Sequence, residues 1–139
     1  MIILDTNVIS EPLKQSPDSN VIDWLNSQLP SSLYTTCISI SELRFGVERL
    51  PVGQRKHALD DALTFALNKL VGDRILPFDF AAAEISGNLF ALGERSGISI
   101  GTADGLIAAI AKSKGYIVAT RDVAPFEALG LSIINPWQE

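Results

Sequence analysis

Four acidic residues stand beside the predicted ends of strands and starts of helices: Asp5, Glu42, Asp104 and Asp122. The first and last of them follow the apolar runs MIIL and YIVAT, and the other two lie in the first turns of the helices expected after Ser39 and Thr102. Mg²⁺ and Mn²⁺ prefer a few oxygen ligands from carboxylates, completed by water. If the fold brings the four acids together, the chain has the side chains for a divalent-metal site.

Each of these acids also has an ordinary structural explanation. Asp5 and Asp122 could cap the helices that follow them, and Glu42 could complete a capping box with Ser39. Asp104 could be an acid favoured by the positive end of its helix. Caps need not point at a shared space, however, so convergence of all four would favour the metal site. Thr6, Asn7 and Thr120 lie beside the acids in sequence, where they could orient a carboxylate or a metal-bound water.

The sequence has few residues that could support other kinds of catalytic site. His57 is the only histidine and lies in the polar segment QRKHALDD, so we interpret it as a solvated helix residue. The chain has no GxxxxGK[ST] or GxGxxG motif for binding nucleotide phosphates. Cys37 is the only cysteine, and its apolar neighbours predict a buried residue without a chemical role.

The elements that must position the acids follow from periodicity and from turn residues. Strands are expected at 1–5, 33–40, 74–78, 116–120 and 131–134, the third at a sheet edge because it contains a proline. Helices are expected at 6–12, 21–29, 41–50, 54–71, 81–96 and 102–115, with Asp79 as an N-cap and glycines at several C-terminal ends.

Alternation of strands and helices predicts an α/β fold: one domain over residues 1–139, with a mainly parallel sheet flanked by helices in three α/β/α layers. Ligands of such sheets bind beyond the carboxyl ends of the strands. Because Asp5 and Asp122 follow strands and Glu42 and Asp104 begin helices, we expect all four acids near that edge.

Composition narrows the class of protein. Of the 139 residues 47% are hydrophobic, which is enough for a sizeable core, and no apolar run is long enough to span a membrane. The N-terminus has no signal-peptide pattern, so we expect a cytoplasmic protein. The net charge of −5 argues mildly against nucleic acid as a partner. Acids gathered around divalent cations would nevertheless form a site that attracts phosphate.

Several separated motifs occur in a familiar order: MIILDTNVISE, ISELRFGVERLP, RILPFD, ISIGTADGLIAAIAKSKG, VATRDVAPFEALG and INPW. Together they resemble the VapC toxins of bacterial type II toxin–antitoxin pairs, most closely the FitB-like branch of the PIN-domain family. The resemblance runs essentially from end to end. It implies a ribonuclease that uses Mg²⁺ or Mn²⁺, with Asp5, Glu42, Asp104 and Asp122 as its acids.

The implied reaction is hydrolysis of an RNA phosphodiester bond. Asp5 and Asp104 would be the main metal ligands, Glu42 would bind metal or orient the attacking water, and Asp122 would complete a second site. Basic residues that could hold RNA are Arg44, Arg49, Arg55, Lys56 and Arg121. Arg44 and Arg121 adjoin the proposed acids, where each could clamp phosphate or neutralise carboxylates.

The resemblance also implies partners. We expect a homodimer, a cognate antitoxin that blocks the site, and operator DNA reached only through that antitoxin, either as this dimer or in a larger toxin–antitoxin assembly. The apolar surface of the helix at 54–70 would contribute to one of these interfaces. The main alternative is a catalytically silent PIN-like subunit that binds antitoxin in a repressor complex. A phosphatase-like enzyme with Asp5 as nucleophile ranks last, because DTN lacks the second aspartate of a DxD motif.

Overall fold

Five short strands form one parallel sheet in a computed structural model that describes residues 1–139. The strands are β1 (Ile2–Leu4), β2 (Leu33–Thr36), β3 (Ile75–Leu76), β4 (Ile117–Ala119) and β5 (Ile133–Ile134). Their order across the sheet is β3-β2-β1-β4-β5, and every neighbouring pair is parallel. β1 is therefore central, with Ile2 paired to Leu33 on one side and to Ile117 on the other. The expected edge position of the proline-containing strand is confirmed for β3.

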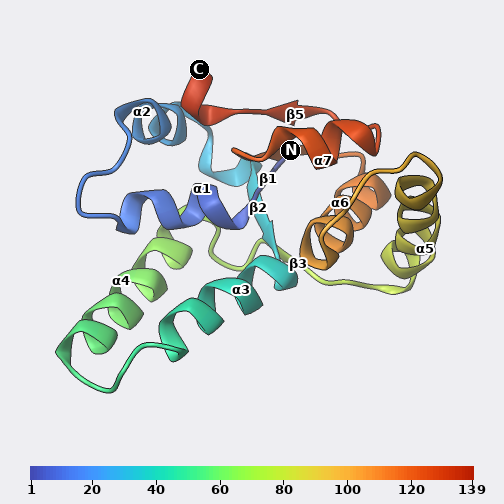
Figure 1. Cartoon of the computed structure of the whole chain (residues 1–139). Helices are drawn as coiled ribbons and strands as arrows, with labels where there is room; N and C mark the ends of the chain where they lie inside the picture. The colour runs from blue at the N-terminus through green and yellow to red at the C-terminus, as the bar shows by residue number, and fades with distance from the viewer.

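Helices cover both faces of the sheet (Figure 1). On one side lie α1 (Thr6–Ser10), α2 (Ser19–Ser27), α3 (Cys37–Glu48) and α4 (Gln54–Leu70), with the short 3₁₀ turns η1 (Glu11–Leu13) and η2 (Pro30–Ser32). On the other side lie α5 (Phe80–Arg95), α6 (Thr102–Lys114) and α7 (Val123–Ala128). The chain ends in the 3₁₀ turn η3 (Pro136–Gln138), which lies beside α2. The predicted α/β/α layering is confirmed.

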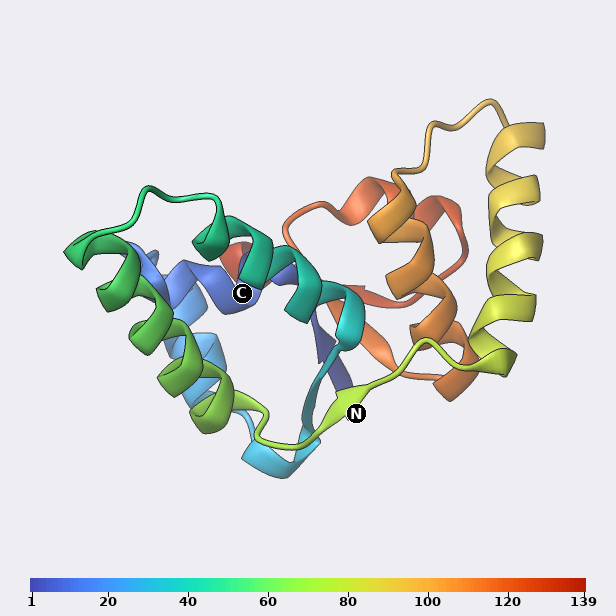
Figure 2. The same cartoon turned by 90° about the horizontal axis from the view of Figure 1, so that it is seen from below.

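Each face of the sheet has its own hydrophobic core. One core joins Leu4 and Val8 to Leu43 and Leu63 of α3 and α4. The other joins Ile3 to α6 and to Phe126 of α7. Viewed from below, α3 and α4 form a hairpin on one side of the sheet while α5 and α6 lie together on the other (Figure 2). No helix is long and apolar enough to cross a membrane.

The boundary between β2 and α3 differs from the prediction of a strand running to residue 40. The strand stops at Thr36, whose side-chain oxygen accepts a hydrogen bond from the backbone N–H of Ser39 at 3.1 Å and so caps α3. Tertiary packing overrides the strand propensity of the β-branched residues that follow. The prediction of a buried Cys37 was also wrong, because this residue in the first turn of α3 is only half-buried.

One glycine lets α6 lie close to α5, and a second lets the loop before α6 pack against α5. A Cβ at Gly105 would collide with the ring of Phe90, and one at Gly93 would lie 2.9 Å from Ile100 Cγ1. Helix ends at Gly72, Gly97 and Gly115 have positive φ, as their predicted role as C-terminal stops requires. Gly105 immediately follows Asp104, so this close packing also fixes the helix turn that carries an acid of the candidate site.

Candidate metal centre

Asp5 lies at the carboxyl end of the central strand β1 and is only 4% exposed. Its Oδ1 accepts a hydrogen bond from Thr6 N at 2.8 Å, and its Oδ2 accepts one from Thr120 Oγ1 at 2.7 Å. Burial raises the pKa of Asp5 to about 6, although these two hydrogen bonds oppose the rise; the nearby carboxylates of Asp104 and Glu42 raise it further. A cation close to Asp5 would stabilise the ionised form of this buried carboxylate.

Glu42 lies in the second turn of α3, one turn later than predicted, because the helix begins at Cys37. The alternative explanation of Glu42 as the capping-box partner of Ser39 is wrong, since Thr36 is the cap. The exposed Glu42 side chain instead accepts a hydrogen bond through Oε1 from Thr6 Oγ1 at 2.6 Å. Thr6 therefore ties this carboxylate to the residue that follows Asp5.

Asp104 lies in the first turn of α6, after an N-cap glycine that makes no side-chain cap. The helix dipole should favour its carboxylate form and lower its pKa. The pKa of Asp104 is raised instead, first by burial and then by the negative charges of Asp122 and Glu42. Burial and the neighbouring negative charges therefore set the direction of the pKa shift at this residue.

Asp122 occupies the N-cap position of α7, but its side chain makes no capping hydrogen bond. Its backbone N–H donates to Thr120 Oγ1 at 3.0 Å, and the same hydroxyl donates to Asp5. Thr120 is fully buried, so one fixed hydroxyl positions both the Asp5 carboxylate and the start of the Asp122 segment. The Asp122 carboxylate is exposed and close enough to Asp104 to raise its pKa.

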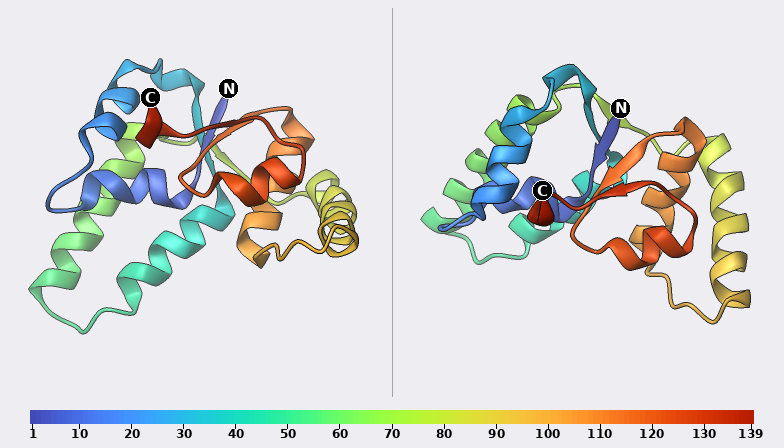
Figure 3. Two further views of the ribbon diagram at one scale, coloured as in Figure 1. Left: turned by 45° about the horizontal axis from the view of Figure 1, so that its top comes forward. Right: turned by 90° about the horizontal axis from the view of Figure 1, so that it is seen from above.

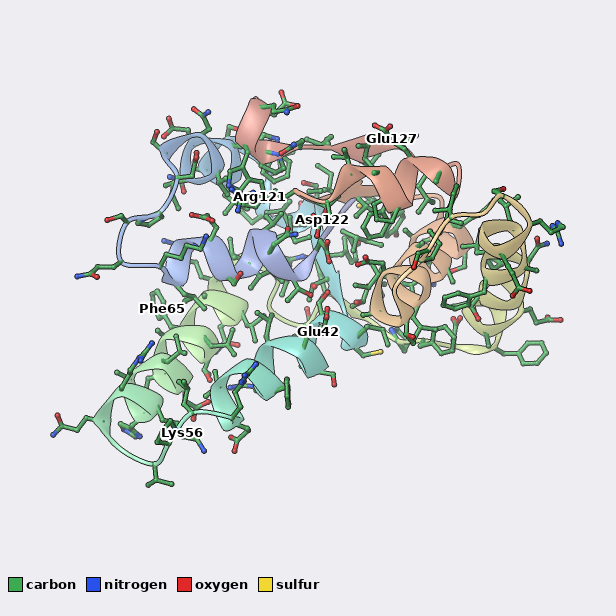
Figure 4. The ribbon with its side chains drawn as sticks, viewed as in Figure 1. Glu42, Lys56, Phe65, Arg121, Asp122 and Glu127 are labelled. Atoms are coloured by element: carbon green, nitrogen blue, oxygen red, sulfur yellow. The ribbon has the colours of Figure 1, made fainter.

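The four acids thus lie around one region at the carboxyl edge of the sheet. Glu42 and Asp122 lie on opposite sides of the start of α1, where Asp5 is located (Figure 4). The two additional views in Figure 3 show α1, the start of α3 and the loop before α7 meeting at this edge. No group of three or more acidic, histidine or cysteine side chains is arranged to hold a metal ion without water as a further ligand. Mg²⁺ usually keeps several waters and binds one or two carboxylates directly, so the donor chemistry fits such an ion.

Comparison with known proteins identifies the family. The sequence model described as the PIN domain matches residues 2–130. The chain belongs to the PIN-domain family. The VapC ribonuclease Y4jK of Sinorhizobium fredii is 46% identical over 99% of both chains, and toxin FitB of Neisseria gonorrhoeae is 42% identical over 100% of both. A solved structure described as FitAB bound to the IR36 DNA fragment superimposes with a TM-score of 0.92, at 41% identity over 99% of this chain and 96% of the other.

The basic residues of this PIN domain have different surroundings. Arg44 pairs with Asp60 of α4 at 2.7 Å and also donates to Thr64. It is therefore directed to the α3–α4 hairpin and forms no ion pair with the acid cluster. Arg49 stacks on Phe45, Lys56 pairs with Glu48, and Arg55 is exposed. Arg121 alone combines a position next to a site acid with a guanidinium that stacks on an aromatic ring, at 5.1 Å from the centroid of Trp137.

Two further sequence-based expectations can be checked directly. Asp79 accepts a hydrogen bond from Ala82 N at 3.0 Å, so its predicted role as the N-cap of α5 is confirmed. His57 is 80% exposed in its side chain and lies 3.4 Å from Asp61 one turn later in α4. The interpretation of a solvated helix residue is therefore also confirmed.

Sequence reasoning missed two residues near the site of the PIN domain. Glu11 is 3% exposed, with its oxygens engaged by Lys14 at 2.9 Å and by Asp18 N at 2.9 Å. Burial alone would raise its pKa, but the contacts with Lys14, the Asp18 N–H and the charge of Arg121 lower it. Trp137 is the second, and its only signal in the sequence is its place in the motif INPW, to which no role was assigned.

A largely apolar groove of about 370 Å³ begins beside the acids. Thr6 and Glu42 line it at one end, and Leu43 and Leu63 of α3 and α4 line it further along. A second groove of similar volume lies between α2 and α4, with the 70% exposed Phe65 among its lining residues. Residues of α4 therefore line both grooves.

Proposed function

We propose that this PIN domain is the toxin of a type II toxin–antitoxin pair and that it hydrolyses RNA phosphodiester bonds with Mg²⁺ or Mn²⁺. The observation that carries the proposal is the gathering of three further carboxylates, those of Glu42, Asp104 and Asp122, around the buried Asp5. Clustered carboxylates raise one another's pKa and cost stability unless a cation compensates them. The names of the relatives, a VapC ribonuclease and a FitB toxin, support the same reading.

The four acids have different roles as metal ligands in this proposal. Asp5 and Asp104 are the least exposed of the four acids and are the main ligands in this proposal. Glu42 and Asp122 are exposed at the rim, where they can bind directly or through water. When bound, a divalent ion activates water for attack on phosphorus and offsets negative charge that develops on the phosphate.

The chain's own contribution is orientation. Thr6 N–H and Thr120 Oγ1 each hold one oxygen of Asp5, so the direction of that carboxylate is fixed before any ligand arrives. Glu42 is held by the Thr6 hydroxyl, and its second oxygen remains available to accept a proton from an attacking water. Removal of either hydroxyl should loosen an acid without changing the charge of the site.

The antitoxin is the partner that best suits the apolar grooves along α4. An antitoxin segment lying there would reach Glu42 at one end, where a basic side chain could neutralise the carboxylates. Operator DNA would then be contacted through the antitoxin, a proposal supported by the DNA-bound FitAB structure. We also propose a homodimer, on the basis of the resemblance to VapC proteins.

The test is cleavage of a cellular RNA pool by purified protein free of antitoxin, in Mg²⁺, in Mn²⁺ and in EDTA. We expect cutting that requires the divalent ion and is lost in Asp5→Asn. Asp79→Asn is the matched control, since asparagine also caps helices and Asp79 lies outside the acid cluster. Absence of cutting by the wild-type protein, together with absence of ion binding by calorimetry, would favour the silent repressor subunit.

A further inference from the structure

Arg121 is exposed beside the acid cluster, and the backbone on both sides of its side chain is fixed. Its own N–H donates to Asn7 Oδ1 at 3.3 Å, and the N–H of Asp122 donates to Thr120 Oγ1 at 3.0 Å. Both acceptors belong to segments that also border Asp5. These hydrogen bonds therefore fix the position of the Arg121 backbone relative to the acids.

The guanidinium itself is held by the end of the chain. Arg121 Cζ lies 5.1 Å from the ring centroid of Trp137. Trp137 is anchored in turn, because its N–H donates to Asn135 Oδ1 at 3.0 Å and its carbonyl accepts from Asn20 Nδ2 at 3.1 Å. Its ring packs against the core beneath α2. The indole face thus provides a rigid platform for a planar cation.

The donors of this guanidinium are not used within the protein. None of the four ion pairs includes Arg121, and none of the side-chain hydrogen bonds engages its guanidinium. Glu11 is near enough for the charge of Arg121 to lower its pKa, but its oxygens are already engaged by Lys14 and by Asp18 N. Arg121 is therefore a positioned cation with free donors, next to a site proposed to bind phosphate.

We propose that Arg121 binds a backbone phosphate of the RNA adjacent to the scissile one, and that Trp137 is the positioning residue that orients its guanidinium. The inference rests on the proposed ribonuclease function and assigns a second phosphate site to it. Arginine suits this role because its fork can donate two parallel hydrogen bonds to one phosphate.

The position of the Arg121 side chain, away from the acids and toward α2, favours the adjacent phosphate over the scissile one. The carboxylate of Asp122 is close to Asp104, whereas the preceding residue, Arg121, stacks on Trp137 beside α2. Arg121 lies on the α2 side of the Asp122 position in Figure 4. An RNA strand crossing the acid cluster would then leave it over η3. A cation at this position also reduces the repulsion between the RNA phosphates and a protein of net charge −5.

The first test measures binding without cleavage. A fluorescent single-stranded hexaribonucleotide is titrated into Asp5→Asn protein in EDTA, alone and combined with Arg121→Gln or with Arg95→Gln. Arg95 is an exposed arginine in the last turn of α5 and serves as the matched control. We expect Arg121→Gln to weaken binding about tenfold and to lower the salt dependence by about 0.7, the value for one phosphate contact on a single strand. The control should change neither quantity.

The second test separates the two phosphates. A dinucleotide with unphosphorylated ends contains only the scissile phosphate, whereas a tetranucleotide contains its neighbours as well. Arg121→Gln should raise KM for the tetranucleotide with little change in kcat, and should leave dinucleotide cleavage unchanged. Trp137→Leu should reproduce this pattern, and Trp137→Phe should retain most of the affinity because an aromatic face remains.

Equal losses on both substrates, or unaltered RNA binding by Arg121→Gln, would overturn the assignment. A loss that also appears in the urea stability of Arg121→Gln and that salt does not modulate would show a structural role instead. If the wild-type protein cuts no RNA, the ribonuclease proposal fails. The binding experiment then still decides whether Arg121 contacts phosphate, because it uses no metal and no cleavage.

Discussion

Replacing Asp5 by asparagine should stabilise the metal-free protein at neutral pH even though it removes the proposed central ligand. Asp5 is 4% exposed, and its pKa rises from 3.8 to about 6 on folding. A carboxyl whose folded pKa is raised favours folding fully only below its unfolded pKa. Its contribution is lost as the pH rises through about 6, because the buried group must then ionise.

The size of the effect follows from the shift. A rise of about two pKa units corresponds to about 3 kcal/mol between the fully protonated and the fully ionised folded protein. Asparagine keeps an oxygen that can accept the Thr6 N–H bond, but it loses the acceptor now used by the Thr120 hydroxyl. That loss costs about 1 kcal/mol. We therefore expect Asp5→Asn to be more stable than the wild type by about 1 to 2 kcal/mol at pH 7.5.

Urea denaturation in EDTA at pH 4.5 and pH 7.5 measures this difference. The advantage of Asp5→Asn should be present at pH 7.5 and should shrink or reverse at pH 4.5. Asp104 remains in both proteins, so the comparison isolates Asp5. Added Mg²⁺ should then raise the stability of the wild type and leave Asp5→Asn nearly unchanged. A variant no more stable than the wild type at pH 7.5 would refute the argument that burial makes the ionised Asp5 carboxylate destabilising.

Three other test substitutions, two of them with a control variant, probe the framework of the site. Thr120→Val should destabilise the protein by about 1 to 2 kcal/mol in urea and shift the acid limb of the pH–rate profile upward, since Asp5 loses a hydrogen bond. Gly105→Ala should cost about 1 to 3 kcal/mol in thermal unfolding because the new methyl group collides with a ring, whereas Gly87→Ala, which meets open space, should stabilise by up to about 1 kcal/mol. Thr36→Ala should cost about 1 kcal/mol and lower kcat, while Thr36→Ser should keep both, since it retains the cap of α3.

Local signals were sufficient for much of the fold. The ends of α4 and α6 were predictable because glycine stops helices at Gly72 and Gly115, and the N-cap of α5 was predictable from Asp79. The meeting of strand-end and helix-start acids followed from the parallel order of strands. These features depend on neighbours in sequence or on a general rule of α/β sheets.

Features that depend on distant packing were not predictable. The run around Thr36 has β-branched residues on both sides of a strand–helix boundary, so its pattern does not show where the strand ends. The burial of Glu11 depends on contacts made after the chain turns at η1. The placement of Trp137 under Arg121 joins the chain end to a loop, and no local pattern encodes that contact.

The two separate hydrophobic cores give the proposed metal a mechanical role. Asp5 leads into α1 and Glu42 lies on α3, so both are supported by the core that contains Leu4 and Leu43. Asp104 belongs to α6 on the opposite face and Asp122 begins α7 there, over the second core. An ion held by acids from both sets would cross-link the two halves of the molecule. Amide hydrogen exchange should then slow together in α3 and in α6 when Mg²⁺ is added, although the buried residues of the two helices belong to different cores.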